Sequence, residues 1–310
     1  MNAWLPRLAR RRRSADKAGV TTSDEMGAGT RPNLGILAGS GVMPGQVAAA
    51  ARAAGRGVFL VGLEGFAEPA VLAPYPHEVI RVLAVGRILA ALRRHECREL
   101  VLVGPVRRPS LLGLRPDAEG ARILARIGRA AFAGDDGLLA AVLRVLGEEG
   151  FRVIGAHEVL REVLAPAGLL SEASPDAVAM ADIARGIAVA QALGAVDVGQ
   201  GCVVQQGIVL AVEAAEGTDA MLARCAGLAW PGPGGVLVKL VKPGQDRRAD
   251  LPTVGPETVR GAAAAGLRGI AFEAGGTLLA DRDATLSGAA AAGLFLIGLD
   301  PDTIKQGDSA

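Results

Sequence analysis

Leu34-Gly-Ile-Leu-Ala-Gly-Ser-Gly-Val-Met-Pro44 predicts a buried strand, a glycine turn and a helix over about 44–54. Gly39 and Gly41 let the backbone approach a ligand closely, and the helix that follows offers unpaired amides to an anion. The stretch departs from a dinucleotide-binding fingerprint, because Pro44 stands at the third glycine position. Two interpretations remain open: an anion-binding loop at Gly39, Ser40 and Gly41, or a plain tight turn.

The alternation of short apolar strands and helices continues outward from this stretch. Further strands are expected at 58–61, 78–83, 100–103, 151–154, 202–205, 208–214, 235–241, 269–273 and 294–298. Further helices are expected at 86–95, 135–148, 176–193, 219–226, 256–265 and 283–292. Glycine turns predict one hairpin joining 202–205 to 208–214 and another through Gly275-Gly276. The pattern indicates an α/β fold with two α/β domains, the N-terminal one Rossmann-like.

The length of 310 residues is sufficient for two domains with sizeable cores. A turn-rich stretch at 168–176 is the best boundary zone. We therefore expect an N-terminal α/β domain over 33–165 and a C-terminal one over 166–302, followed by a tail over 303–310. Only 3% of residues are aromatic, so Ala, Val, Leu and Ile must build both cores.

Residues 1–32 differ from the rest because they carry a cluster of arginines without an adjoining apolar segment. This composition is not that of a secretory signal. It predicts a disordered basic extension, or a basic arm in which Trp4 and Leu5 touch anionic lipid.

The composition also excludes several classes of protein. The net charge of +1 argues against broad electrostatic binding to nucleic acid. The three cysteines, Cys97, Cys202 and Cys225, are scattered, which fits a reducing compartment and offers neither a zinc site nor a disulfide framework. No run of about 18 uncharged apolar residues is present, so we expect no transmembrane helix.

Residues 239–255, Lys-Leu-Val-Lys-Pro-Gly-Gln-Asp-Arg-Arg-Ala-Asp-Leu-Pro-Thr-Val-Gly, are the first candidate for chemistry. Leu251-Pro252 favours an extended backbone, so Asp250 is expected on a constrained loop, with Thr253 near the start of the next helix. A carboxylate that lies between cations such as Lys242 and Arg248 on one side and a helix N-terminus on the other suits a group that holds a metal ion or orients water beside a phosphate. A solvated charged loop is the alternative.

Other candidates lie where strands end. Gly104 opens a turn after strand 100–103, where Arg107 and Arg108 either grip a phosphate or stay solvated. His157 follows strand 151–154 and is either a site residue or a structural histidine. After strand 208–214, Glu216 and Asp219 lie close enough in sequence to share a magnesium ion, and Thr218 or Asp219 also suits a helix cap.

Seven separate segments together resemble one family. They are Gly35-Ile-Leu-Ala-Gly-Ser-Gly-Val-Met-Pro44, Gly134-Asp-Asp136, Glu149-Gly-Phe151, Gly155-Ala-His-Glu-Val159, Asp197-Val-Gly-Gln-Gly201, Val212-Glu-Ala-Ala-Glu-Gly-Thr-Asp-Ala-Met221 and Ala249-Asp-Leu-Pro-Thr-Val-Gly255. The chain from about Leu34 to Asp300 thereby resembles the LpxI type of UDP-2,3-diacylglucosamine pyrophosphatase. Three features depart from the family pattern: the arginine-rich N-terminus, the short Gly/Pro-rich segment Trp230–Gly235, and Pro105 where asparagine is expected.

The resemblance implies hydrolysis of UDP-2,3-diacylglucosamine to 2,3-diacylglucosamine 1-phosphate (lipid X) and UMP in lipid A biosynthesis. It further implies Mg²⁺ as cofactor, a lipid-binding active-site cleft between the two domains, and an essential aspartate that falls on Asp250. On this interpretation Asp250, Glu216 and Asp219 hold the metal or water. The remaining candidates bind substrate: Gly39, Ser40, Gly41, Gly104, Arg107, Arg108, His157, Gln200, Gly201, Thr218, Lys242, Arg248 and Thr253.

A lipid-linked UDP-sugar substrate implies a cytoplasmic protein in peripheral contact with the cytoplasmic leaflet of the inner membrane. A homodimer remains open. The competing hypothesis is a nucleotide-sugar or dinucleotide-binding protein without hydrolase activity, built on the Gly39–Gly41 loop. That hypothesis leaves the Asp250 loop without a role.

Overall fold

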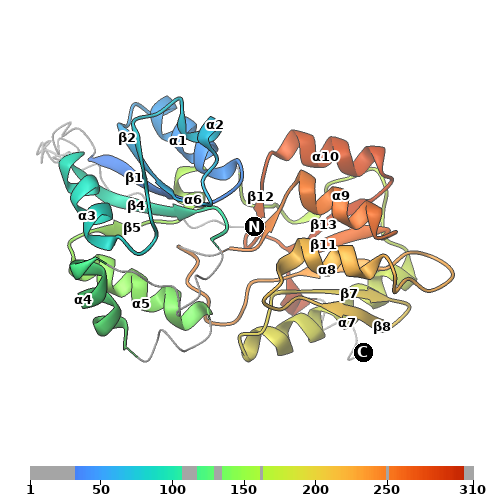
Figure 1. Ribbon diagram of the computed structural model, residues 1–310. Coiled ribbons are helices and arrows are strands. Elements are labelled where there is room, and N and C mark those ends of the chain that lie inside the picture. The colour runs from blue at the N-terminus through green and yellow to red at the C-terminus, as the bar shows by residue number, and fades with distance from the viewer. Residues whose placement is uncertain (1–31, 107–116, 129–134, 161–162, 249–250, 304–310) are drawn as a thin grey trace, which may run out of the picture. The chain divides into compact units, whose positions relative to one another are not determined.

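A computed structural model describes residues 32–106, 117–128, 135–160, 163–248 and 251–303 of the chain. They form a mixed α/β structure with two domains, each built around its own sheet (Figure 1). This confirms the fold class expected from the alternating pattern.

The N-terminal sheet has five strands in the order β3-β2-β1-β4-β5. Every neighbouring pair is parallel. The strands are β1 (Asn33–Ala38), β2 (Val58–Leu63), β3 (His77–Ile80), β4 (Cys97–Val103) and β5 (Arg152–Val153). The chain runs outward from β1 to β3 and then returns to the other side of β1, which is the strand order of the Rossmann fold.

Helices cover both faces of this sheet, which explains why β2 is buried along its whole length. The face formed by residues such as Leu34 and Ile36 packs against α1 (Met43–Ala53), α2 (Pro69–Leu72) and α6 (Ala156–Val159). The opposite face, which includes Phe59 and Val61, packs against α3 (Val85–Arg94), α4 (Ala118–Ile127) and α5 (Asp135–Glu148).

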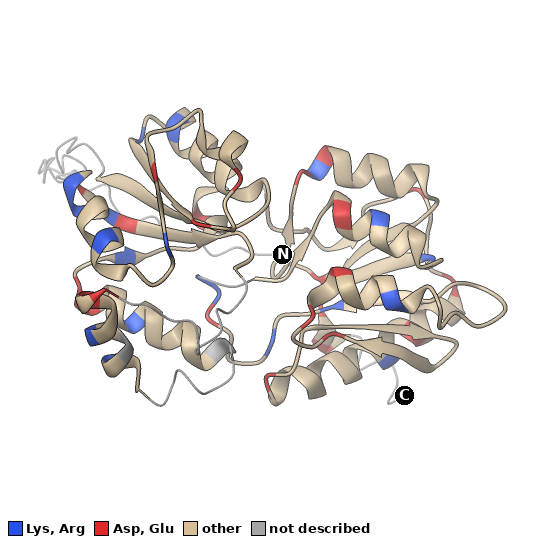
Figure 2. Ribbon diagram, viewed as in Figure 1, with Lys and Arg blue, Asp and Glu red and all other residues tan. Residues whose placement is uncertain are grey.

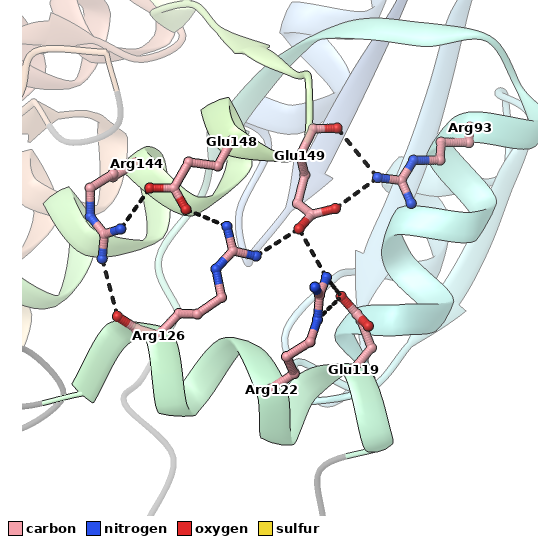
Figure 3. Close-up of polar contacts among 7 residues, drawn as sticks. All are labelled: Arg93, Glu119, Arg122, Arg126, Arg144, Glu148 and Glu149. Carbon is pink, nitrogen blue, oxygen red and sulfur yellow. Dashed lines mark hydrogen bonds and ion pairs between the residues drawn. The ribbon is translucent and has the colours of Figure 1, made fainter.

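Charged side chains connect α3, α4 and α5 on the outside of the domain (Figure 3). Glu149, which directly follows α5, accepts hydrogen bonds from Arg93 of α3 at 2.9 Å and from Arg126 of α4 at 2.7 Å. Arg126 also pairs with Glu148, and Arg122 pairs with Glu119 and Glu149. These contacts, together with the Arg144–Glu148 pair, are called the helix ion-pair network below.

The C-terminal sheet has six strands in the order β6-β13-β11-β9-β7-β8. The three inner strands β9 (Val236–Lys239), β11 (Gly269–Glu273) and β13 (Phe295–Leu299) are parallel. Antiparallel strands flank them: β6 (Gly168–Leu169) pairs with β13, and β7 (Gly201–Gln205) pairs with β9 and β8 (Ile208–Val212).

Helices cover both faces of the C-terminal sheet. Helix α7 (Ala177–Ala195) packs on one face, and α8 (Gly217–Cys225), α9 (Pro256–Ala264) and α10 (Arg282–Ala291) pack on the other. By length and composition alone, α7 is the one described helix long and apolar enough to cross a membrane. It contains Asp182 and Arg185, and its Ile183 and Ile187 lie in the core beside the sheet, so packing accounts for its apolar side.

The two predicted hairpins have different outcomes. The hairpin of β7 and β8 is confirmed, and its turn residues Gln206 and Gly207 have φ of 51° and 78°, as a tight two-residue turn requires. The hairpin through Gly275-Gly276 is wrong. Strand β12 (Leu278–Leu279) does not return along β11; it pairs in parallel with β10 (Thr253–Val254), which is distant in sequence.

Candidate active site

One edge of the C-terminal sheet gathers polar side chains from several strands. Lys239 and Glu273 are the last residues of the parallel strands β9 and β11. Because β7 runs antiparallel to β9, its first residue, Gly201, lies opposite Lys239, and Glu213 follows the end of β8 at the same edge. The carboxyl ends of parallel strands are the usual location of ligand sites in α/β sheets.

Lys239 lies at the centre of this edge and is only 5% exposed. Its Nζ donates to Thr218 Oγ1 at 2.8 Å and to the backbone carbonyl of Thr253 at 3.0 Å. Thr218 Oγ1 in turn donates to Glu213 Oε1 at 2.8 Å. A buried ammonium group needs such partners, because removing a charge from water without hydrogen bonds is costly. The chain of Glu213, Thr218, Lys239 and the Thr253 carbonyl is called the Lys239 chain below.

The Glu213 carboxylate uses only one of its two oxygens within the described residues. The side chain is 7% exposed, Oε1 accepts from Thr218, and Oε2 is buried without a hydrogen-bond partner. A buried carboxylate oxygen without a donor is costly, so it is a natural position for a ligand, a cation or a water molecule.

Two glycines make room for Glu213. A Cβ at Gly199 would lie 2.0 Å from the Glu213 carbonyl oxygen, and a Cβ at Gly201 would lie 2.8 Å from Glu213 Oε2. The requirement for glycine at these positions is therefore steric: the backbone of residues 199–201 lies directly against Glu213. Gln200 lies between them with Oε1 buried and unpartnered among the described residues.

Glu273 is half-buried at the end of β11. Its Oε2 accepts from the backbone amide of Val241 at 3.1 Å, which fixes the segment that follows β9. Burial raises the pKa of the Glu273 carboxyl above its usual value, against smaller opposing effects of that hydrogen bond and of Arg247.

The predicted residues Thr218, Thr253 and Gly201 take part in or adjoin the Lys239 chain. Glu216 and Asp219, predicted as metal ligands, belong to the start of α8, and the hydrogen bonds of the Lys239 chain do not include them. The Glu216 carboxylate pairs with Arg224 at 2.9 Å, and its pKa is lowered by its own backbone amide and by Arg224. Asp219 is exposed in the first turn of α8.

The predicted phosphate-binding cations have partners within the protein. Lys242 Nζ lies 2.6 Å from Asp197 Oδ1, and both guanidinium and backbone amide of Arg248 donate to Asp246. Hydrogen bonds from Arg248 hold the pKa of Asp246 below its usual range. Asp250 lies outside the described residues, and no group of three His, Cys, Asp or Glu side chains that could hold a metal occurs within them.

The glycine loop of the N-terminal domain contacts the loop after β4. The Gly39 amide donates to the Val103 carbonyl at 2.9 Å, and both the amide and the hydroxyl of Ser40 donate to the Pro105 carbonyl. A Cβ at Gly39 would lie 2.2 Å from the Gly104 carbonyl oxygen, so these two loops pack directly at the carboxyl ends of β1 and β4.

The third amide of this loop already contacts an anionic group, because Gly41 N donates to Glu68 Oε1 at 3.1 Å. Among the other predicted residues of this domain, the His157 ring lies against Gly155, and its buried Nδ1 has no partner among the described residues. Arg107 and Arg108 lie outside the described residues. Their roles and those of the glycine loop stay predictions.

Sequence reasoning missed Glu213 and underrated Lys239. The available signal was Lys239 itself, a lysine within the apolar run 235–241, because a charged residue on a buried strand requires a buried partner. Its partners, Thr218 and Glu213, follow β8 and are 21 and 26 positions away, so no local spacing rule connects them to it.

Comparison with known proteins agrees with the two-domain architecture. The LpxI N-terminal domain family matches residues 33–163, and the LpxI C-terminal domain family matches residues 166–297. The UDP-2,3-diacylglucosamine pyrophosphatase LpxI of Caulobacter vibrioides is 45% identical over 274 residues, which cover 86% of this chain and 98% of the relative. The Lys239 chain lies within the part matched by the C-terminal domain family.

Proposed function

The chain belongs to the LpxI family, and from this premise we propose that it hydrolyses the pyrophosphate bond of UDP-2,3-diacylglucosamine. The products would be 2,3-diacylglucosamine 1-phosphate and UMP, within lipid A biosynthesis. The observation that carries the proposal is the 45% identity, over nearly the full length of the relative, to a protein named for this activity.

Pyrophosphate hydrolysis has four requirements. A water oxygen must form a bond to one phosphorus, the bridging P–O bond must break, and the water must give up a proton. Charge on the phosphate oxygens must also be balanced while this happens. We assign the orientation of the water to the Asp250 carboxylate, which follows the cations Lys242, Arg247 and Arg248 in the sequence and can accept the proton.

Magnesium, as the proposed cofactor, would neutralise charge on the phosphate oxygens. Mg²⁺ prefers one or two carboxylates together with substrate phosphates and waters, so it does not require a complete protein cage. Glu213 Oε2 is the buried carboxylate oxygen without a partner among the described residues, and it fits this preference. We therefore propose Asp250 and Glu213 as metal ligands in preference to Glu216, which Arg224 occupies, while Asp219 remains a further candidate.

Substrate binding is proposed for the candidates that surround these groups. Lys242 and Arg248 would balance phosphate charge by exchanging their present partners, Asp197 and Asp246, for the ligand. The Gly39–Gly41 loop would bind the nucleotide or the sugar phosphate at the carboxyl ends of β1 and β4, where the Gly41 amide now contacts Glu68.

The chemical nature of the substrate extends the proposal to location. Two acyl chains place the substrate in a membrane, so the protein would be cytoplasmic and contact the inner leaflet peripherally, with the acyl chains in a cleft between the domains. A homodimer is compatible with this arrangement.

Product analysis tests the proposal directly. Purified protein is incubated with UDP-2,3-diacylglucosamine, with magnesium or with a chelator, and the products are identified by mass spectrometry. We expect lipid X and UMP with magnesium and neither with the chelator, and we expect Asp250→Ala to lower turnover by about two orders of magnitude or more.

Two other outcomes would change the conclusion. A folded protein that binds the substrate without cleaving it would favour a nucleotide-sugar-binding protein. Cleavage at a normal rate by Asp250→Ala would retain the enzyme and remove Asp250 from the site.

A further inference from the structure

We propose that Thr218 and Lys239 are positioning residues for the hydrolysis. They attach the backbone at Thr253, three positions after Asp250, to the buried Glu213 carboxylate, and the rate of the chemical step depends on this attachment. The proposal rests on the proposed function, and it assigns a role to two side chains that need not touch the substrate.

The direction of each hydrogen bond in the Lys239 chain follows from the chemistry of the groups. The lysine ammonium donates only, so Thr218 Oγ1 and the Thr253 carbonyl must accept from it. The Thr218 hydroxyl has a single hydrogen, which is left for Glu213 Oε1. Thr218 therefore accepts from the cation and donates to the anion, and its hydroxyl connects two charges without contributing one.

Burial makes the loss of any of these hydrogen bonds costly. Lys239, Thr218 and Glu213 are 5%, 9% and 7% exposed, so water cannot readily replace a lost partner. The Thr253 carbonyl is one of only two acceptors that Lys239 has among the described residues. Moving Thr253 away would leave a buried ammonium group short of an acceptor, and this penalty holds the backbone in place.

The segment that follows Asp250 is also fixed on its other side. Leu278 N donates to the Pro252 carbonyl at 2.7 Å, and Ala280 N donates to the Val254 carbonyl at 2.9 Å. The short β10–β12 pairing thus holds residues 252–254, and the hydrogen bond from Lys239 to the Thr253 carbonyl connects them to the C-terminal sheet. Since α9 begins at Pro256, the residue that Lys239 bonds, Thr253, lies in the sequence between Asp250 and a packed helix.

The Lys239 chain differs from a fully bonded buried ion pair at Glu213 Oε2. Buried carboxylate oxygens are usually hydrogen-bonded, and Oε2 has no donor among the described residues, so a ligand, a cation or a water molecule can occupy the position beside it. Because Thr218 fixes Oε1, it also fixes the direction in which Oε2 is presented. The same two side chains thereby set both the Thr253 backbone and the proposed ligand oxygen.

The test compares two substitutions at one position. Thr218→Val keeps the β-branched shape and removes the hydroxyl, while Thr218→Ser keeps the hydroxyl. We expect kcat of Thr218→Val to fall about tenfold to a hundredfold with KM changed less than about threefold, because misplacement affects the chemical step more than binding. Thr218→Ser should retain kcat within about threefold.

Hydrogen exchange supplies a readout that does not depend on activity. Peptides containing Thr253 should exchange faster in Thr218→Val and in Lys239→Met than in the wild type, and at the wild-type rate in Arg144→Ala. Arg144 belongs to the helix ion-pair network and serves as the matched control. Melting temperatures identify any variant that fails to fold, and Thr218→Ser then still allows the comparison with wild type.

Equal kcat values for wild type and folded Thr218→Val, or unchanged exchange around Thr253, would overturn the positioning role. So would an equal loss of kcat in Thr218→Ser and Thr218→Val, since the hydroxyl would then not be the group that matters. Failure of the proposed function is distinguishable, because in that case the wild type itself would not release UMP, while the exchange experiment would still report on the hydrogen bond from Lys239 to the Thr253 carbonyl.

Discussion

The helix ion-pair network and the Lys239 chain use the same kinds of side chain in opposite surroundings. Arginines gather on α3 and α4 of the N-terminal domain (Figure 2). There, Arg93, Arg122 and Arg144 are more than half exposed, and the carboxylates have several alternative cations. In the C-terminal sheet a single lysine and a single glutamate lie on either side of one hydroxyl, all buried.

This difference indicates which charges matter. An exposed ion pair gains little, because water and salt screen the attraction and side-chain entropy opposes it. A buried charge cannot lose its partner without a large penalty, so the Lys239 chain restricts the backbone around it. Many charges stabilise the packing of α4 weakly, and a few buried ones fix the candidate site strongly.

Removing one cation from each region should give the largest difference in stability between the two regions. Lys239→Met removes the buried cation that Thr218 connects to Glu213 and leaves the Thr253 carbonyl without its lysine donor, and we expect the free energy of unfolding to fall by about 3 kcal/mol or more. Arg126→Met removes a partly exposed partner of Glu148 and Glu149, and Arg93 and Arg122 still neutralise Glu149. Its effect should be much smaller. Urea denaturation of both variants measures the contrast, and similar losses would break the comparison.

Replacing one glycine by alanine in each region should give smaller changes in stability, and the two changes should have opposite signs. Gly199→Ala places a Cβ 2.0 Å from the Glu213 carbonyl oxygen, so we expect a loss of roughly 1–3 kcal/mol as the backbone shifts. Gly147→Ala in α5 meets nothing within 4 Å, so we expect a gain of about 0.5–1 kcal/mol from helix propensity. Thermal melts measure both, and a tolerated Gly199→Ala would show that residues 199–201 do not need their close approach to Glu213.

The pH dependence of stability should differ in sign between the two regions. Burial raises the pKa of Glu273 above 4.5 in the folded protein, so its contribution favours folding at low pH and is lost as pH rises from about 4.5 through the folded value. Hydrogen bonds from Arg126 and Arg93 lower the pKa of Glu149, so its contribution is present above about 4.5 and is lost as pH falls through the folded value.

Two glutamine variants isolate these contributions. The melting temperature of Glu273→Gln relative to wild type should rise as pH increases from about 4.5 to 7. That of Glu149→Gln relative to wild type should fall as pH increases to about 4.5 from below the folded pKa of Glu149. The expected changes are the smallest of those proposed, and differences of the same sign for both variants would contradict the assignment of the two environments.

Local patterns in the sequence were sufficient for most elements. The strand predicted at 269–273 is β11, and the helix predicted at 135–148 is α5, since both have clear periodicity and clear ends. The prediction through Gly275-Gly276 failed because two glycines report a turn but not the partner of the next strand. That partner, β10, lies more than twenty residues earlier in the chain.

The candidate site was less predictable for a similar reason. Spacing selected Glu216, Lys242 and Arg248 for their charge and position, and the structure gives each a partner within the protein. Glu213 is buried and bonded to Thr218, whereas Glu216 pairs with Arg224, and this difference depends on the packing of α8 against the sheet. The sequence therefore selected stretches of the chain as candidates, and tertiary contacts decide which carboxylate oxygen has no partner among the described residues.

The most direct test of the account compares turnover after the same chemical change in the two regions. Glu213→Gln keeps an acceptor for Thr218 but removes the negative charge. Glu149→Gln likewise keeps an acceptor and removes the negative charge, but in the helix ion-pair network. With UDP-2,3-diacylglucosamine and magnesium, we expect kcat of Glu213→Gln to fall about tenfold or more and that of Glu149→Gln to stay within about twofold of wild type. Equal kcat values for the two folded variants would contradict the placement of the chemistry at this edge of the C-terminal sheet.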